Sequence, residues 1–542
     1  MTRYIFVCGG VMSGIGKGVS TATIARILKS RGWRVTATKI DPYLNVDAGT
    51  MNPIEHGEVF VTDDGMECDQ DVGNYERFLD EDIPRENYMT SGSVYLSVIQ
   101  RERNLEYGGK CVQVVPHIPQ EVIARLERAS RRARADFTVV EVGGTVGEYE
   151  NILFLEAARM MHLANPKNVL FVLVSYLPVP EKIGEMKTKP TQHAVRAMNA
   201  TGIQPDFIIA RSVVPMDTPR KQKLAVLCNV SESDIISAPD VASIYEVPVN
   251  FEEEGLSVKI LEKFGLRAKR HDMRSWNALV RRIHQARRPV RIGIVGKYFG
   301  SGNFTLTDSY ISVIEALKHA SWAFGRKPEL TWLDAEDYEK HPARLRALSR
   351  FDGIVVPGGF GSRGVEGKTK VIRYARTHRI PYLGLCYGLQ LAVVEFARHV
   401  AGLAGAHTTE VDPKTKHPVI QTMPDQIANI REKRLGGSMR LGAYACRLKS
   451  GTAARRAYGE TNITERHRHR YEINNEYLAD IEKRGFIASG VNPERNLVEI
   501  MELRGHPFFL GTQFHPELKS RPLHPHPLFR EFIRAAIRGK RG

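Results

Sequence analysis

Short apolar runs alternate with amphipathic stretches over roughly the first half of the chain. The runs predict strands at residues 4–8, 35–40, 111–115, 137–142, 169–177, 207–210 and 235–237. Between several of them, apolar residues recur at helical spacing, as at Ile24, Ile27 and Leu28. Near-continuous apolar strands that alternate with helices indicate a parallel sheet covered on both faces. Ligands of such sheets bind beyond the carboxyl ends of the strands, so the residues that follow the strands are the informative ones.

A second series of the same kind begins after a basic stretch. It predicts strands at 292–296, 353–357, 381–385, 486–491, 497–503 and 508–514, helices at 310–317 and 389–396, and an Arg/Gly-rich loop at 431–442. The predicted fold class is therefore α/β, with two doubly wound parallel-sheet domains at 1–265 and 291–542. A basic helical linker at 266–290 is predicted to join them.

Charge and composition narrow the function classes. The net charge of +16 is typical of proteins with anionic partners. Residues 266–291 hold nine Lys/Arg against one Asp, and apart from Trp276 they lack the aromatics of a single-strand binder, so we expect no nucleic-acid partner. No apolar run approaches the ~20 residues of a membrane span. The chain also enters its first strand without a leader, and its six cysteines form no C-x-x-C pair. We expect a cytoplasmic protein without a zinc ribbon or disulfides.

The first predicted strand runs into a glycine-rich turn, GGVMSGIGKG, followed by a helix from about Lys17. Glycines let backbone N–H groups face an anion, the helix N-terminus adds positive dipole, and Lys17 would add a full charge. The turn departs from the G-x-x-x-x-G-K-[ST] phosphate loop twice. Val11 occupies the position of the first glycine, and Gly18 occupies the position of the Ser/Thr that ligates magnesium. A plain strand-to-helix turn is the alternative; if a nucleotide binds, carboxylates from elsewhere must hold the metal.

Carboxylates follow two other predicted strands. Predicted strand 35–40 contains Lys39, and Asp71 lies in the acid-rich segment that follows it. Glu141 lies in predicted strand 137–142, beside a glycine turn. Mg²⁺ takes one or two carboxylates plus phosphate oxygens, so Asp71 and Glu141 are candidate magnesium ligands. Solvated loop acids are the alternative reading.

A further polar cluster follows strand 169–177 and opens a helix. Its two lysines, two hydroxyls and helix N-terminus suit a phosphate, and an exposed charged loop is the alternative. The cluster consists of Lys187, Thr188, Lys189, Pro190, Thr191 and Gln192.

The second domain carries a candidate nucleophile. Cys386 stands in GLCYG between a strand and a helix, the layout of a nucleophile elbow with cysteine in place of serine. A helix N-terminus favours the reactive thiolate. His515 could act as its base and Glu517 could orient the imidazole, while the glycine turn at 357–361 could supply an oxyanion hole. The alternative is an inert buried cysteine.

These motifs together resemble a known family. The second domain resembles the class I (triad) glutamine amidotransferases, and the first resembles the synthetase domain of the CTP synthases. The resemblance covers nearly the whole chain. Its motifs, in order, are GGVxSGIGKG, KIDPYLNVDAGTM, HGEVFV, EVGGTVG, KTKPTQ and RHRHRYEIN.

The resemblance implies a reaction and its participants. ATP would phosphorylate the 4-oxygen of UTP, ammonia released from L-glutamine would displace the phosphate, and CTP would form. The family also implies Mg²⁺, GTP as an activator, CTP as a feedback inhibitor and a homotetramer.

The resemblance also assigns residues, position by position. Around the ATP phosphates it places Gly14, Ile15, Gly16, Lys17, Gly18 and Val19, with Lys17 on the transferring group, Lys39 nearby and Asp71 and Glu141 on Mg²⁺. At adenine it places Pro239, Asp240 and Val241. At UTP or CTP it places Ser13, Glu148, Tyr149, Glu150, Lys187 to Gln192 and Lys223. At glutamine it places Gly359, Tyr387, Gly388, Leu389, Gln390, Glu410 and Arg470. A GTP-responsive lid would comprise Arg363, Gly364 and Glu366, with the loop through Arg440.

The chain departs from the family pattern in three places. Glu148-Tyr149 stands where Asp-Ile is usual, which puts the CTP inhibitor site in doubt. Tyr387 stands in the elbow where leucine is common, and residues 299–307 differ from the usual run.

Two other functions compete with this reading. A cobyrinic-acid-type ATP-dependent amidase also joins a phosphate-loop domain to a triad amidotransferase, although the lysines of KTKPTQ favour a triphosphate substrate. A nucleotide-responsive assembly protein with vestigial catalysis is the second, and the complete set of Cys386, His515 and Glu517 argues against it.

Overall fold

The computed structural model describes residues 2–182, 184–297, 300–301, 304–305, 308–432 and 436–539. The chain divides into two compact units. Unit 1 comprises the chain up to Ala48 together with Asp71–Val280, and unit 2 comprises Gly49–Gln70 and the chain from Arg281 onward. The segment Gly49–Gln70, which the sequence analysis counted within its first domain, thus packs with the second unit. The predicted domain limits themselves stay predictions.

Unit 1 is built on a parallel seven-stranded sheet of order β5-β2-β6-β1-β7-β8-β9. The strands are β1 (Arg3–Gly9), β2 (Val35–Asp41), β5 (Tyr88–Thr90), β6 (Phe137–Val142), β7 (Val169–Tyr176), β8 (Phe207–Ser212) and β9 (Ile235–Pro239). The helices are α1 (Lys17–Ser30), α3 (Gln70–Leu79), α4 (Ser91–Arg103), α5 (Val114–Arg132), α6 (Ile152–Ala164), α7 (Lys189–Ala200), α8 (Thr218–Cys228), α9 (Val247–Glu253), α10 (Leu256–Lys263) and α11 (Arg274–Gln285).

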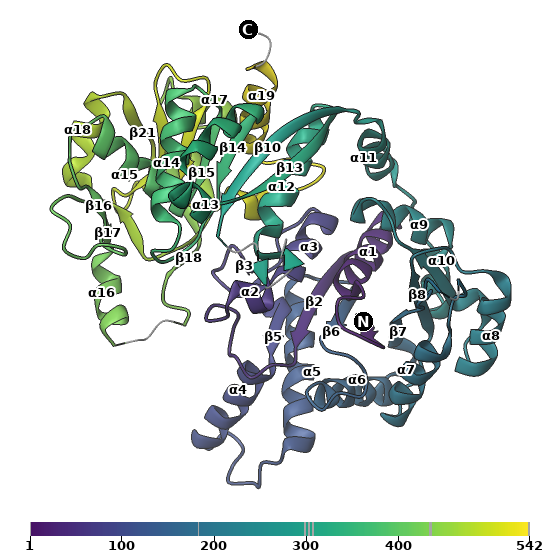
Figure 1. Cartoon of the computed structure of the whole chain (residues 1–542). Coiled ribbons are helices and arrows are strands. Elements are labelled where there is room, and N and C mark those ends of the chain that lie inside the picture. Colours follow the sequence, from purple (N-terminus) through teal and green to yellow (C-terminus); the bar gives the residue numbers. More distant parts are fainter. Residues whose placement is uncertain are drawn as a thin grey trace. The chain divides into compact units, whose positions relative to one another are not determined.

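Helices cover both faces of this sheet, which explains why its strands are apolar along their whole length. Tyr4, Phe6 and Cys8 of β1 point to one face and pack with α5, α6 and α7 in a single apolar cluster. Helix α1 contacts β1, β2 and β6 and packs beside α9 (Figure 1). Ligands of such a sheet bind beyond the carboxyl ends of its central strands.

Unit 2 contains a nine-stranded sheet of order β13-β10-β14-β15-β23-β22-β21-β18-β19, parallel from β13 to β23 and antiparallel from there on. Its strands are β10 (Arg288–Gly296), β13 (Arg326–Asp334), β14 (Gly353–Val356), β15 (Tyr382–Leu385), β18 (Arg440–Leu448), β19 (Asn462–His469), β21 (Phe486–Val491), β22 (Val498–Leu503) and β23 (Phe509–Thr512).

Helices again cover both faces of that sheet (Figure 1). Helices α12 (Ile311–Ala323) and α19 (Pro527–Arg538) pack on one face, and α14 (Val365–Thr377) and α15 (Tyr387–His399) pack on the other. Smaller elements of the unit are the hairpin β3 (Val59–Val61) and β4 (Glu67–Asp69), the hairpin β11 (Gly300–Ser301) and β12 (Phe304–Thr305), and the sheet of β16 (His407–Thr408), β17 (Pro418–Thr422) and β20 (Tyr471–Ile473). Its remaining helices are α2 (Pro53–His56), α13 (Ala335–Lys340), α16 (Pro424–Arg431), α17 (Ala453–Tyr458) and α18 (Leu478–Lys483).

The α/β prediction is confirmed, and two local predictions are wrong. Residues 111–115 form no strand: α5 begins at Val114, Val114 and Val115 are exposed, and β5 occupies the position beside β2. The predicted loop 431–442 ends early, because β18 begins at Arg440, whose buried guanidinium pairs with Glu499 at 2.8 Å. Residues 433–435 of that loop lie outside the described residues.

In the described part of the chain, no helix combines the length and apolar character needed to span a bilayer.

Candidate functional site

The glycine-rich turn joins β1 to α1, and its backbone is left-handed at three positions. Gly14 has φ 73° and Gly16 has φ 85°, as glycine readily allows, but Val11 has φ 79°. A β-branched residue is strained in this region. Lys17, the first residue of α1, donates a 2.7 Å hydrogen bond from Nζ to the backbone oxygen of Gly144. Burial lowers the pKa of Lys17.

Four charged side chains gather at the carboxyl ends of β2 and β6. Lys39 Nζ pairs with Asp71, with Glu141 at 3.1 Å and with Asp41 at 3.5 Å. Tyr75 donates its hydroxyl hydrogen bond to Glu141. Burial, reinforced by the charge of Asp71, raises the pKa of Glu141 to about 7, although Lys39 and Lys17 oppose the shift. The sequence prediction that Lys17, Lys39, Asp71 and Glu141 converge is consistent with this cluster.

Gly18 shows why the phosphate-loop pattern fails at this position. A Cβ added there would lie 1.9 Å from Asp71 Oδ1. The space that a Ser or Thr side chain would need is therefore filled by the Asp71 carboxylate, which projects from the first turn of α3. The absence of a Ser/Thr side chain at position 18 and the position of Asp71 are therefore linked, because both side chains would occupy the same space.

The donor set of this cluster fits a magnesium ion. Asp71 and Glu141 offer the hard carboxylate oxygens that Mg²⁺ prefers, and Glu141 is held in a low-dielectric setting where a cation would favour its ionised form. Among the described residues, no group of three or more His, Cys, Asp or Glu side chains is arranged to hold a metal. Any metal here would depend on two carboxylates plus ligand and water oxygens.

The segment after β6 carries one of the predicted nucleotide contacts close to Lys17. Glu148 is exposed and accepts hydrogen bonds from the backbone nitrogen of Thr145, at 2.9 Å, and from its hydroxyl. Tyr149 is 92% exposed, so its ring has no packing role within unit 1. Ser13 in the glycine-rich turn is also exposed.

The polar cluster after β7 opens α7 as predicted. Lys187 pairs with Glu185 at 2.6 Å, and Gln192 donates to the Thr188 hydroxyl at 3.0 Å. Thr188, Thr191 and Gln192 are buried, whereas Lys189 is exposed. Lys223 lies exposed on α8, a helix that contacts α7.

Arg211 is a residue that the sequence analysis missed. It lies at the carboxyl end of β8 and donates from Nη2 to Asp240 Oδ1 at 2.8 Å, in the segment that Pro239, Asp240 and Val241 form after β9. Its guanidinium also approaches Gly16 of the glycine-rich turn, about 3.9 Å from where a Cβ would stand. The signal was available, because Arg211 follows a predicted strand.

The second cluster is built around Cys386 in unit 2. Cys386 lies between β15 and α15 with φ 50° and ψ −98°, a strained geometry that directs its side chain out of the turn. A Cβ on Gly388 would lie 2.1 Å from the backbone oxygen of Val356, and one on Gly384 would lie 2.7 Å from the Tyr382 hydroxyl. Both glycines of the predicted elbow are therefore required by packing.

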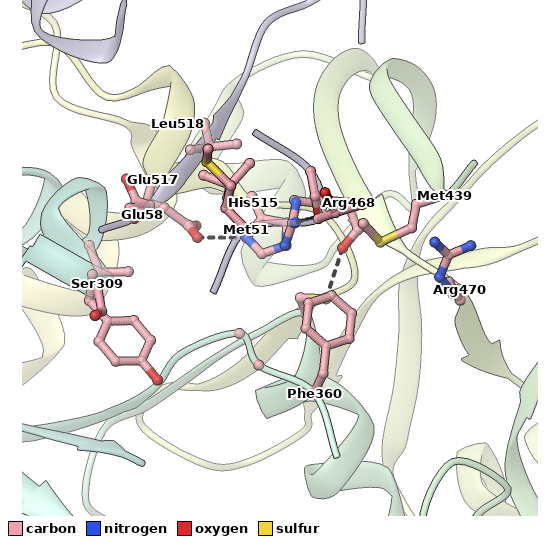
Figure 2. Close-up of a pocket in the computed structure, with 18 residues that line it drawn as sticks. Met51, Glu58, Ser309, Phe360, Met439, Arg468, Arg470, His515, Glu517 and Leu518 are labelled. Atoms are coloured by element: carbon pink, nitrogen blue, oxygen red, sulfur yellow. Dashed lines mark hydrogen bonds and ion pairs between the residues drawn. The ribbon is translucent and has the colours of Figure 1, made fainter. Parts of the chain in front are cut away.

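His515 and Glu517 complete this cluster. His515 Nδ1 lies 2.7 Å from Glu517 Oε1 (Figure 2), and Gln513 Nε2 lies 3.7 Å from Cys386 Sγ. Burial disfavours a charged imidazole, but the negative charges of Glu517 and of a Cys386 thiolate outweigh burial and raise the pKa of His515 well above its usual value. This setting therefore favours the protonated imidazole of His515.

The glycine turn 358–361 lies against both reactive groups. A Cβ on Gly358 would lie 2.9 Å from His515 Cε1 and 3.8 Å from Cys386 Cβ. The Gly361 N–H donates to Glu410 at 2.6 Å. The structure thus brings Gly359 and Glu410 to the same site as Cys386. Gln390, also predicted there, is buried and donates to the backbone oxygen of Tyr471 at 2.9 Å.

A cavity of about 370 Å³ opens at Cys386. It is lined by Cys386, His515, Glu517, the glycine turn, Arg468, Arg470, Met439, Glu58, the segment from Gly49 to Met51 and neighbouring residues (Figure 2). The sequence did not predict that Gly49, Thr50, Met51, Glu58 and Val59, which precede Cys386 by more than 300 residues, line this cavity.

The motif RHRHR follows the alternation of β19. Arg466 pairs with Asp63, and Arg468 pairs with Glu67 at 2.8 Å, so these arginines hold the hairpin of β3 and β4. His467 and His469 alternate with them, are buried, and contact each other at 3.0 Å. Arg470 donates to Gln426 at 2.7 Å and to Ser438 at 2.9 Å.

Comparisons with known proteins extend over the whole molecule. The family model "CTP synthase N-terminus" matches residues 3–266, and "Glutamine amidotransferase class-I" matches residues 305–535. The chain is 51% identical over 537 residues to the CTP synthase of Rubrobacter xylanophilus, covering 99% of this chain and 96% of that protein. It is 50% identical to the CTP synthase of Thermococcus kodakarensis, with both chains covered completely, and 48% identical to that of Geobacillus kaustophilus, covering 99% and 100%.

The chain belongs to the CTP synthase family.

The segment expected to form the lid in a CTP synthase family member lies at the start of α14. Arg363 pairs with Glu336 at 3.0 Å, and Gly364, with φ 72°, precedes the first residue of the helix. Glu366 pairs with Arg398 at 2.9 Å. These ion pairs connect the segment to α13 and α15 of the same unit.

Proposed function

We propose that this chain aminates UTP to CTP, consuming ATP and releasing the ammonia from L-glutamine. One observation carries the proposal. Cys386, His515 and Glu517 form a nucleophile, base and orienting acid beside a cavity, in a chain similar over its full length to CTP synthases. We assign the glutamine half of the reaction to unit 2 and the nucleotide half to unit 1.

In the glutamine half, the Cys386 thiolate attacks the carboxamide carbon of glutamine. The carbonyl oxygen gains negative charge, and the backbone N–H groups of the turn at Gly359 are suited to stabilise it, since the turn lies beside Cys386. The C–N bond then breaks as His515 gives its proton to the leaving nitrogen, producing ammonia and a thioester. A water molecule that passes its proton to His515 hydrolyses the thioester to glutamate.

Two side chains of the cavity region are suited to the amino acid end of glutamine. Glu410 is held at the turn by the Gly361 N–H, and burial raises its pKa despite that hydrogen bond and two nearby lysines. It would pair with the α-amino group. Arg470, which lines the cavity, would pair with the α-carboxylate.

In the nucleotide half, the uracil 4-oxygen attacks the γ-phosphorus of ATP and ADP leaves. Such transfers depend on positioning and charge stabilisation. Backbone N–H groups from Gly14 to Val19 would cradle the phosphates, and Lys17, at the start of α1, would stabilise the transferring group. Ammonia then attacks the 4-carbon and phosphate departs.

Mg²⁺, held by Asp71 and Glu141, would neutralise charge on the triphosphate when bound. Lys39 pairs with both carboxylates and so holds them next to each other. We assign adenine to Pro239, Asp240 and Val241.

We assign UTP and inhibitory CTP to a shared set of residues, namely Ser13, Glu148, Tyr149, Glu150, Lys187 to Gln192 and Lys223. GTP would act as activator at Arg363, Gly364 and Glu366. A homotetramer in the cytoplasm completes the proposal, which rests for these points on the family resemblance.

One assay tests the proposal against its rivals. Purified protein is incubated with ATP, Mg²⁺, UTP and glutamine, and CTP is measured chromatographically, with single omissions of each component as controls. We expect CTP only in the complete mixture. Glutamine hydrolysis without CTP would favour an amidase of another substrate, such as the cobyrinic acid type. Neither activity in folded protein would favour an assembly protein.

A further inference from the structure

Tyr387 connects two parts of the glutamine site that are far apart in the sequence. It directly follows Cys386 and is the first residue of α15. Its side chain is 1% exposed and does not line the cavity, so it is not placed to touch glutamine. Its hydroxyl instead donates a 2.8 Å hydrogen bond to the backbone oxygen of Gly361.

That hydrogen bond reaches the turn at a point fixed from several sides. Gly361 has φ 77°, and its N–H is held by Glu410 at 2.6 Å. Lys297 donates to the neighbouring backbone oxygen of Phe360. The position of the turn, whose Gly358 lies beside Cys386 and His515, therefore depends on the groups that hydrogen-bond to Gly361 and Phe360.

Lys368 fixes the ring of Tyr387 from the other side. It lies on α14 with no exposed surface, and its Nζ stands 5.3 Å from the centroid of the Tyr387 ring. Among the described residues this Nζ has no hydrogen-bond partner. Burial lowers the pKa of Lys368 to about 7. The negative face of the Tyr387 ring attracts the ammonium form of Lys368, which a leucine side chain could not do.

We propose that Tyr387 is a positioning residue, which holds the turn 358–361 in place against Cys386 through its hydroxyl while Lys368 holds its ring. The inference rests on the proposed glutamine hydrolysis. It gives a role to the residue at which this chain departs from the leucine common in the family. The transition state of thioester formation needs the turn's N–H groups in place, whereas the nucleophilicity of Cys386 does not.

The test is Tyr387→Phe, which removes the hydroxyl and keeps the ring. The matched control is Tyr458→Phe, which removes another hydroxyl of unit 2, bonded to Glu465 at 2.7 Å. Three quantities are measured: kcat and KM for glutamine hydrolysis, the rate of Cys386 alkylation by iodoacetamide, and CTP synthesis from ammonium salt.

For Tyr387→Phe we expect kcat for glutamine to fall about tenfold to hundredfold. Complete loss of an oxyanion donor lowers kcat by about 10²–10³-fold, and a displaced donor should have a smaller effect. We expect KM to stay within about threefold of the wild-type value. The rate of Cys386 alkylation and CTP synthesis from ammonium salt should be unchanged. Tyr458→Phe should match the wild type in all three measurements. A kcat equal to the control, or a parallel loss of all three activities, would overturn the inference. If Tyr387→Phe does not fold, Tyr387→Leu is measured with the same expectations.

Lys368→Met provides an independent check. We expect a smaller fall in kcat than for Tyr387→Phe, and no further fall when Lys368→Met is added to Tyr387→Leu, because the ring it contacts is gone. Additive losses would contradict the coupling. Wild-type protein that hydrolyses glutamine but forms no CTP would refute the proposed function and leave this inference standing.

Discussion

The turns after β1 and after β15 have the same layout and opposite uses. Each joins a buried parallel strand to a helix, and each holds a non-glycine residue at positive φ, namely Val11 at 79° and Cys386 at 50°. A glycine near each turn lacks the space for a side chain. At Gly18 that space is filled by the carboxylate of Asp71, whereas at Gly388 it is filled by the backbone oxygen of Val356. In the first turn the glycine makes room for a charged side chain, and in the second it makes room for the backbone of the neighbouring strand β14.

The two clusters also differ in how their charges are balanced. In the first cluster Lys39 and Glu141 are buried and Asp71 is half-buried, and the pKa of Glu141 is raised by burial and by the charge of Asp71, so an added cation would favour its ionised form. Cys386, His515 and Glu517 balance their charges among themselves, and the pKa of His515 is raised. We therefore expect the first cluster to need bound ligands for its role and the second to need none beyond its substrate.

The largest expected effect separates the two clusters outright. Cys386→Ala should lower glutamine-dependent CTP formation by about 10⁴-fold or more, as loss of a nucleophile does. Synthesis from ammonium salt should persist and rise with pH, because NH₃ is the attacking species. CTP formation is measured with each nitrogen source. Loss of both activities in folded protein would mean that the sites are inseparable, and retention of both would exclude Cys386 as the nucleophile.

The converse change acts on unit 1. Asp71→Asn or Glu141→Gln should reduce CTP formation from either nitrogen source on the order of 10³-fold, since both remove charge stabilisation of phosphoryl transfer. Glutamine hydrolysis should survive in part. Titrating Mg²⁺ in each variant gives the apparent metal affinity, and near-normal synthesis in both would rule out the assignment.

Gly18→Ser tests whether packing or pattern decides the first turn. The substitution restores the Ser/Thr position of the phosphate-loop consensus and leaves Val11 as the other departure, yet its Cβ would meet Asp71 Oδ1 at 1.9 Å. We expect synthesis to fall on the order of 10²-fold, because small misplacements of catalytic groups are this costly. Gly539→Ala, where a Cβ meets only ordinary contact at 3.6 Å, is the control. Improved synthesis in Gly18→Ser would show that the consensus outweighs the contact.

Glu517→Gln sharpens the account of the second cluster through its pH profile. Glu517 raises the pKa of His515, so its loss should lower that pKa. The imidazolium is lost as pH rises through the His515 pKa, so the alkaline limb of kcat/KM for glutamine should move to lower pH. We also expect kcat to fall on the order of 10-fold to 100-fold. A profile that coincides with the wild type between pH 6 and 10 would assign Glu517 a purely steric role.

The smallest expected effect concerns strain at Val11. Val11→Gly removes a left-handed β-branched residue, and relief of strain exceeds the entropy cost of glycine by about 1 kcal/mol. The unfolding midpoint of unit 1 should rise by about 2–4 °C in a thermal scan. Exposed Val46→Gly in the same unit should lower it or leave it unchanged. A lower midpoint for Val11→Gly would mean that the valine side chain stabilises the turn.

Hydrophobic patterning predicted the parallel strands and the two turns because buried parallel strands are apolar throughout. It failed where other forces dominate. Strand β5 has only three residues, and β18 and β19 carry Arg440, Arg466 and His467, whose burial depends on ion pairs and hydrogen bonds. The cysteine, histidine and glutamate of unit 2 were predictable, since each follows a strand. The contact of Tyr387 with Gly361 was not, because it depends on three-dimensional packing. Arg211 was missed although it directly follows a predicted strand.

The hairpin of β3 and β4 is synthesised long before β19, the strand that carries its ion-pair partner. Asp63 and its partner Arg466 are 403 positions apart. At about 5–20 residues per second, the ribosome needs roughly 20–80 s to deliver the partner after the hairpin has emerged. During that interval the buried Phe60 has no unit 2 surface to pack against, and the hairpin needs protection from aggregation. Truncated chains that stop before β19 should therefore be marked substrates for chaperones.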